Sequence, residues 1–152
     1  MVLNPREAAL EQQIRQTRPA NLQIVSSVSR ALMPALFNRA AVFVSTSALE
    51  GFPNVFLEAA AAGVPIASLD VGEEFLRDAA AGESAAGDID RLSEFVRRCW
   101  QAPSPGAGIA RRYLQEHHDL SQQVWRLREI LTDTLADCRR KSASPRRQAS
   151  ET

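Results

Sequence analysis

Two short apolar segments joined by one helical segment constrain the fold of this chain most. Ala41–Thr46 and Val64–Leu69 are almost wholly apolar, as is typical of strands buried on both faces of a sheet. Between them, Pro53–Ala62 predicts a helix that ends at Gly63, since glycine readily adopts the left-handed conformation of a helix terminus. Strand, helix and strand at this spacing predict parallel strands joined by a right-handed crossover. The expected fold class is therefore α/β, with a Rossmann-like parallel sheet flanked by helices.

The segments before this unit continue the alternation of helix and strand. Glu7–Thr17 predicts a helix, and the alternating, β-branched run Leu22–Val28 predicts a strand. Ser29 can cap a following helix, with Pro34 in or near its first turn.

The segments after it become helical. A short helix over Glu73–Ala80 and a brief last strand over Ser84–Ala86 come first. Three longer helices are then expected: Ile89–Gln101, Ile109–Glu116 and Gln122–Arg139. The last carries one apolar stripe, formed by Val124, Leu127, Leu131 and Leu135.

The 152 residues fit one domain, which we expect over residues 1–141, followed by a disordered basic tail over 142–152. From Arg139 onward, five basic residues stand against one acid. This tail is expected either to be solvated or to contact acidic lipid weakly at a membrane surface. The formal net charge of the whole chain is +0, which gives no reason to expect a nucleic acid partner.

Cysteine usage and the N-terminal sequence bear on location. Cys99 and Cys138 lie in helical stretches without metal-ligand spacing, which favours a reducing compartment. The first residues, MVLNPREAALEQQ, lack the apolar core of a signal peptide. We therefore expect a cytoplasmic protein, either throughout or peripheral at the inner face of the membrane.

Chemistry is expected at the carboxyl ends of the parallel strands, where such sheets bind ligands. Glu50 lies in the loop beyond the strand that ends at Thr46. The turn Gly51–Asn54 then leads into a helix, whose free N–H groups and positive dipole end suit a phosphate. Gly51 lets the backbone approach a ligand, because it has no Cβ.

Glu58 is the only charged residue from Gly51 to Leu69, and its helix is apolar on every face. We therefore expect it to be buried, which is costly for a carboxylate that is not hydrogen-bonded. Vicinal ribose hydroxyls would satisfy both of its oxygens. A neighbouring backbone N–H or a basic side chain would serve equally well, and the sequence leaves both interpretations open.

The stretch EGFPNVFLEA resembles the signature of glycosyltransferase family 4, enzymes of the GT-B fold that carry a Glu, seven residues and a second Glu in this context. Here the two are Glu50 and Glu58. The match continues into AAGVPIASLDVG and GESAAGDIDRL, and LQIVSSVSRALMPALFNRAAVFVSTS resembles the segment upstream. The resemblance thus runs from about Glu7 to the last long helix, and it implies the C-terminal, donor-binding half of a GT-B enzyme.

This resemblance implies a role for each matching residue. Glu50 would be catalytic and would contact the hydroxyls of the transferred sugar, Glu58 would hold the ribose, and Ser29 and Arg30 would lie near the base. The loop against sugar and phosphate would be formed by Gly51, Phe52, Pro53 and Asn54. The amides near Val55 would face the diphosphate.

Two departures from the family pattern bear on activity. Family members carry an earlier strand followed by an Arg and Lys loop, and an acceptor-binding domain with a catalytic His. We therefore expect a domain that is incomplete at its N-terminus and lacks a full active site, partnered by an acceptor-binding domain or by a second copy. The other departure is Glu73, where many relatives have Gly, because an inward-pointing acid would disfavour a phosphate. Glu74 is a candidate for the role of the family's helix-start Glu.

The resemblance favours the donor-binding domain of a retaining glycosyltransferase that uses a UDP-, GDP- or ADP-sugar and a glycan or lipid-linked acceptor. No metal ion or other cofactor is expected, because we identify no Asp-x-Asp motif and because the helix start supplies positive charge. A non-catalytic sugar-nucleotide-binding or assembly module is the first alternative, and a sugar-nucleotide epimerase of the same fold is the second.

Overall fold

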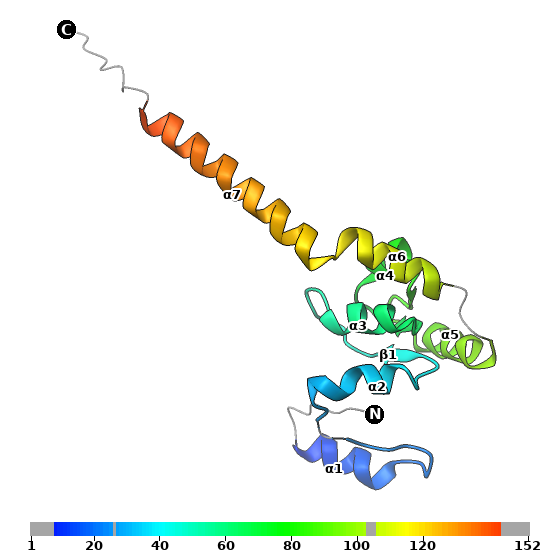
Figure 1. Cartoon of the computed structure of the whole chain (residues 1–152). Helices are drawn as coiled ribbons and strands as arrows, with labels where there is room; N and C mark the ends of the chain where they lie inside the picture. The colour runs from blue at the N-terminus through cyan, green and yellow to red at the C-terminus, as the bar shows by residue number, and fades with distance from the viewer. Residues whose placement is uncertain (1–7, 26, 103–105, 144–152) are drawn as a thin grey trace.

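The computed structural model describes residues 8–25, 27–102 and 106–143 and contains a three-stranded parallel sheet (Figure 1). The strands are β1 (Phe43–Ser45), β2 (Ile66–Ser68) and β3 (Gly82–Ser84), in the order β1-β2-β3. Phe43 pairs with Ile66, and Ile66 pairs with Gly82. The prediction of an α/β fold with a parallel sheet is confirmed.

Helical segments connect and follow these strands: α1 (Ala8–Thr17), the 3-10 turn η1 (Arg30–Leu32), α2 (Met33–Phe37), α3 (Asn54–Ala62), α4 (Glu73–Asp78), α5 (Ile89–Gln101), α6 (Ala107–His117) and α7 (Leu120–Ala143). Each predicted helix is present, and α5 has the predicted bounds. Pro34 stands in the first turn of α2, where its missing N–H costs nothing. Ser29 precedes η1 in an extended conformation, but its side chain makes no capping hydrogen bond.

Helices cover both faces of the sheet, so β2 at its centre is fully buried. One face packs against α2, α3, α4 and α6 through a core of apolar side chains that includes Phe37, Phe56, Ile66, Leu76 and Ala110. The other face packs against α5 through Ala67, Ala85 and Leu92. Alternate residues of β2 therefore face opposite layers, as a strand in a three-layer α/β fold requires.

Two close contacts set the position of α3. Gly63 ends this helix in the left-handed conformation (φ 76°), and α6 passes so near that a Cβ on Gly63 would lie 3.1 Å from the Cβ of Ala107. The Arg111 side chain donates hydrogen bonds to the carbonyl oxygens of Ala61 (3.0 Å) and Ala62 (3.1 Å). A cation from α6 thus satisfies carbonyls at the negative end of α3.

The expected strand over Leu22–Val28 is reduced, among its described residues, to a single bridge at Val25. A strand needs a partner along its length, and the described part of β1 has its ladder with β2 alone. The prediction that β1 is buried on both faces is also wrong, since β1 is an edge strand and Val44 is 42% exposed. The alternation of LQIVSSV indicated β propensity, but propensity does not supply the neighbouring strand.

The last strand begins at Gly82, two residues before the predicted Ser84–Ala86. Its register with β2 sets this start, because Gly82 lies so close to Ile66 that a Cβ would be 1.8 Å from the Ile66 carbonyl oxygen. Ala86 already has a positive φ of 52° in the turn that follows.

Helix α7 extends away from the α/β body as a single long rod (Figure 1). It continues through Ser142 and Ala143, which were assigned to the tail, and residues 144–152 lie outside the described part of the chain. No helix in the described ranges combines the length and the apolar character needed to cross a bilayer.

Candidate functional site

The loop after β1 carries the first group of expected site residues. Ser47, which is half-buried, donates a hydrogen bond from its hydroxyl to Oε1 of the exposed Glu50 at 3.0 Å. This bond holds the carboxylate at the carboxyl edge of the sheet. Space around Gly51 is open, since a Cβ built there would meet no atom within 4 Å.

Pro53 is buried and forms the N-cap of α3 in an extended conformation (φ −75°, ψ 104°). The N–H of Phe56 donates to the Pro53 carbonyl at 2.8 Å, so the amides of Asn54 and Val55 precede the first internal hydrogen bond of the helix. These two N–H groups lie at the positive end of the helix dipole. A helix thus begins where the sequence predicted one, with Asn54 exposed and Val55 half-buried.

Phe52 joins a cluster of aromatic rings at the same edge. It meets Phe75 edge-on at 5.3 Å between centroids and lies nearly parallel to the His118 ring at 6.3 Å. Tyr113 contacts Phe75 at 6.1 Å. Phe52 remains 43% exposed, so one part of its ring faces solvent beside these partners.

An open pocket of about 390 Å³ lies against this cluster, lined by Gly51, Phe52, Gly72, Glu73, Glu74, Phe75, Asp78, Tyr113 and His118. Nε of Arg77 donates a hydrogen bond to Oδ1 of Asp78 at 2.9 Å. The Asp78 carboxylate raises the pKa of the Arg77 guanidinium above its ordinary value. Because Asp78 has this cationic partner, Glu73 and Glu74 supply most of the negative charge that lines the pocket. Their charge disfavours a phosphate there.

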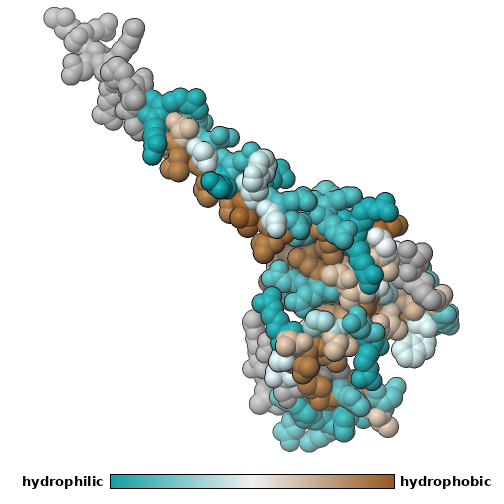
Figure 2. All heavy atoms as spheres, in the orientation of Figure 1, coloured by the Kyte–Doolittle hydropathy of each residue, from teal (hydrophilic) through white to brown (hydrophobic). Residues whose placement is uncertain are grey.

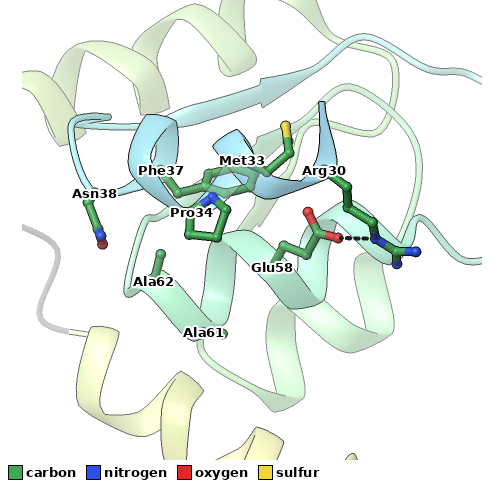
Figure 3. Close-up of a pocket in the computed structure, with 8 residues that line it drawn as sticks. All are labelled: Arg30, Met33, Pro34, Phe37, Asn38, Glu58, Ala61 and Ala62. Carbon is green, nitrogen blue, oxygen red and sulfur yellow. Dashed lines mark ion pairs between the residues drawn. The ribbon is translucent and has the colours of Figure 1, made fainter. Parts of the chain in front are cut away.

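Glu58 is half-buried, with 35% of its side chain exposed, and so the prediction of full burial is wrong. It lies on the side of α3 that faces η1 and α2, where these short segments leave a groove (Figure 3). Its Oε1 is 3.9 Å from Nε of Arg30, which fits the alternative of a basic partner. That distance is too long for a hydrogen bond, and the Arg30 side chain is 89% exposed.

The groove forms a second pocket of about 430 Å³, lined by Arg30, Met33, Pro34, Phe37, Asn38, Glu58, Ala61 and Ala62. Arg30 and Glu58 lie at one end of it and Asn38 at the other, with apolar side chains between them (Figure 3). A mostly apolar pocket with a few polar groups is typical of a small-molecule binding site.

The expected site residues are therefore divided between two pockets, one along the middle and end of α3 and one at the loop before it. Arg30 and Glu58 share one pocket, and Gly51 and Phe52 share the other. Ser29 is exposed before η1.

Sequence reasoning missed several lining residues. Met33, Pro34 and Asn38 line the Glu58 pocket, and Tyr113 and His118 line the acidic one. In the sequence, His118 has the features of an ordinary surface histidine near the end of a helix. Its position directly after α6 brings it beside Phe52, a contact between segments far apart in the sequence that spacing alone could not reveal.

Asp88 and Asp90 have the Asp-x-Asp spacing that can bring two carboxylates to one metal ion, so the statement that the sequence has no such motif is wrong. Oδ1 of Asp88 accepts hydrogen bonds from the N–H groups of Asp90 (2.9 Å) and Arg91 (3.0 Å), so Asp88 acts as the N-cap of α5. The part of the chain that the structure describes contains no group of three or more potential metal ligands.

A family model described as "Glycosyl transferases group 1" matches residues 3–102. The matched range contains all three strands and both glutamates of the loop and helix after β1. No curated protein and no solved structure shows a significant match to the chain.

Proposed function

The chain belongs to the group 1 glycosyl transferases, and from this premise we propose that it binds the nucleoside-diphosphate sugar whose sugar is transferred. The family supports glycosyl transfer as the reaction class. The observation that carries the donor-binding proposal is the half-buried Glu58 at one end of the apolar-walled pocket, loosely paired with Arg30.

The nucleoside is proposed to occupy the Glu58 pocket. A carboxylate 3.9 Å from a guanidinium, with neither group fully desolvated, retains oxygen lone pairs for the two hydroxyls of a ribose. Met33 and Pro34 supply apolar surface for a base. The pocket volume of about 430 Å³ lies within the range of small-molecule sites.

The diphosphate is proposed to lie at the start of α3. The amides of Asn54 and Val55 and the helix dipole favour negative charge there. The open space around Gly51 allows the backbone to approach a ligand. Glu73 and Glu74 line the pocket that Gly51 shares, so their negative charges oppose the diphosphate, and the helix start is the feature that attracts it.

The sugar is proposed to lie beside Glu50, whose carboxylate is held by Ser47 and accepts hydrogen bonds from sugar hydroxyls. Retention of anomeric configuration, a glycan or lipid-linked acceptor, a cytoplasmic location and independence of metal ions belong to the same proposal. Its partners would be the nucleotide sugar together with an acceptor-binding domain.

A binding test of the proposal uses the full chain with UDP-, GDP- and ADP-sugars. At least one donor should raise the melting temperature, since a ligand that binds only the folded state stabilises it. Glu58→Gln keeps the side-chain size but removes the charged acceptor, and we expect the dissociation constant to rise at least tenfold. Glu94→Gln on α5 is the matched control, because Glu94 also sits on a helix beside an arginine, Arg97.

The outcome that would contradict donor binding is a wild-type melting temperature that none of the nucleotide sugars changes. Equal affinity of wild type and Glu58→Gln would instead exclude the Glu58 pocket as the nucleoside site. Binding that persists in EDTA supports independence of metal ions.

A non-catalytic binding module is the second candidate, and the pairing of Arg30 favours it. Arg30 is the cation that lines the Glu58 pocket, and it pairs with Glu58 rather than at the start of α3. A leaving diphosphate needs positive charge in the transition state. Donor hydrolysis measured on wild type and Glu50→Gln separates the two. Hydrolysis lost in the variant, with binding retained, supports the enzyme, whereas binding without any turnover supports the module.

A further inference from the structure

Helix α7 presents an apolar stripe outside the proposed donor site. Every side chain described from 120 to 141 is exposed, and the two buried clusters include no residue of this helix. Leu120, Val124, Leu127 and Leu131 have exposed fractions between 54% and 76%. Figure 2 shows hydrophobic side chains gathered along one side of the rod. Such a face is costly to leave in water and is typical of an interaction surface.

The spacing of the stripe is that of a coiled coil. Its positions alternate by four and three residues: Leu120, Val124, Leu127, Leu131, Thr134 and Cys138. A repeat of 3.5 residues keeps one seam facing a partner helix along a left-handed supercoil. Thr134 fits this seam, because its hydroxyl already donates to the Ile130 carbonyl at 2.7 Å and needs no partner across it.

We infer that α7 pairs with α7 of a second copy of this chain in a parallel two-stranded coiled coil. Taking Val124 as position a makes Leu127 position d. A β-branched residue at a, followed by Leu at d, favours two strands. Leu131 and Cys138 then occupy the next two a positions.

The flanking side chains favour the parallel orientation. In a parallel pair, Arg128 of one copy lies opposite Gln123 of the other, and Leu135 lies opposite Ile130, so no like charges meet. In an antiparallel pair with the stripes in full overlap, Arg128 would face Arg128 of the other copy, which is repulsive.

Charged residues on the opposite face of α7 and at its C-terminal end limit the contact between helices to this seam. Arg126, Glu129 and Asp133 occupy the outer face, where they remain solvated. Lys141 takes the next d position and ends the apolar repeat. With fewer than three full heptads in the seam, the dimer is expected to dissociate reversibly on dilution.

Sedimentation equilibrium of the full chain tests the pairing. The apparent mass should rise with concentration from 16.7 kDa towards twice that value. Leu127→Lys places a charge in the seam and should raise the dimer dissociation constant at least tenfold. Glu129→Lys adds the same side chain to the outer face of the same helix and should leave the constant unchanged. Circular dichroism melts keep loss of the dimer distinct from unfolding of the body.

Oxidation tests the orientation. In a Cys99→Ser background, parallel helices bring the two Cys138 thiols to the same level, and mild oxidation should yield a disulfide-linked dimer. Antiparallel helices in full overlap separate them by about 30 Å. A chain that is monomeric at all concentrations overturns the inference. This is also the result expected if α7 binds a different protein instead of a second copy. A dimer that resists Leu127→Lys, or one that forms no Cys138 disulfide, overturns it as well.

Discussion

At the scale of single residues, a substitution at Gly51 can test ligand binding without disturbing the fold. A methyl group at this position would meet no atom within 4 Å, and the φ of Gly51 is not in the left-handed range. Gly51→Ala should therefore leave the melting temperature within about 2 °C of wild type. If the diphosphate approaches the backbone here, the added Cβ should weaken nucleotide-sugar binding at least tenfold, as titration calorimetry can measure.

Gly108→Ala is the matched control for this substitution, since Gly108 also has open space around it and lies on α6. Unchanged donor affinity in Gly51→Ala would show that the ligand does not approach the backbone at this turn.

Glu73 offers a test of where the phosphates lie. It is exposed, it begins α4, and it shares a pocket with Gly51 and Phe52. If the diphosphate lies at the nearby start of α3, Glu73→Gln removes a repulsive charge and should strengthen donor binding by roughly threefold to tenfold at low salt. The gain should shrink as salt is added, because exposed charges are screened.

Two comparisons make the Glu73 prediction specific. The uncharged nucleoside should bind wild type and Glu73→Gln equally, and Glu94→Gln on α5 should not alter donor affinity. A donor affinity that Glu73→Gln leaves unchanged or weakens would place the diphosphate elsewhere.

The roles of Glu50 and Glu58 could be proposed from sequence because the stretch EGFPNVFLEA resembles a family signature that contains both glutamates. The burial of Glu58 could not be predicted. Its helix is apolar all round, yet the neighbouring η1 and α2 are short and leave that side of α3 open as a groove. Exposure at such a position depends on the length of the packing partner, which no local pattern encodes.

At the scale of elements, the contact between α6 and the end of α3 depends on Arg111. Its two hydrogen bonds to the carbonyls of Ala61 and Ala62 are replaced by water in Arg111→Ala. We expect a loss of about 1 kcal/mol in the free energy of unfolding, or about 3 °C in melting temperature. Arg112→Ala, an exposed neighbour on the same helix, controls for the change in helix propensity. Equal melting temperatures in the two variants would contradict a structural role for Arg111.

The strand–helix–strand unit around α3 could be predicted because several local signals agree there, including two apolar runs and a glycine stop at Gly63. The segment LQIVSSV shows the limit of such reasoning. Its alternation is a property of the segment alone, whereas a strand also requires hydrogen-bonding neighbours, and the described residues give it only the bridge at Val25.

At the scale of the whole molecule, the apolar stripe of α7 predicted a helix that buries one face, but not what covers it. An amphipathic helix packs equally well on its own domain, on another domain or on another chain. In this structure the described core includes α6 residues such as Ala110 and Leu114 but no residue of α7. The described core of the α/β fold therefore does not fix the position of α7, and we infer that a second copy of the chain covers its stripe.

Because α7 contributes nothing to the described core, we predict that the chain can be shortened at the junction between α6 and α7. A protein ending at Asp119 should melt cooperatively within about 2 °C of the full chain in its monomeric form, because none of the described buried residues is lost. It should bind the nucleotide sugar with unchanged affinity, since all residues that line the two pockets remain. It should also be monomeric and more soluble without the exposed stripe. A protein ending at Gln101 is the informative comparison, because it also lacks Ala110 and Arg111, which pack on α3. We expect that shorter protein to melt at least 5 °C lower or to be unfolded. If removal of α7 alone unfolds the body, the helix is part of the domain rather than an arm for assembly.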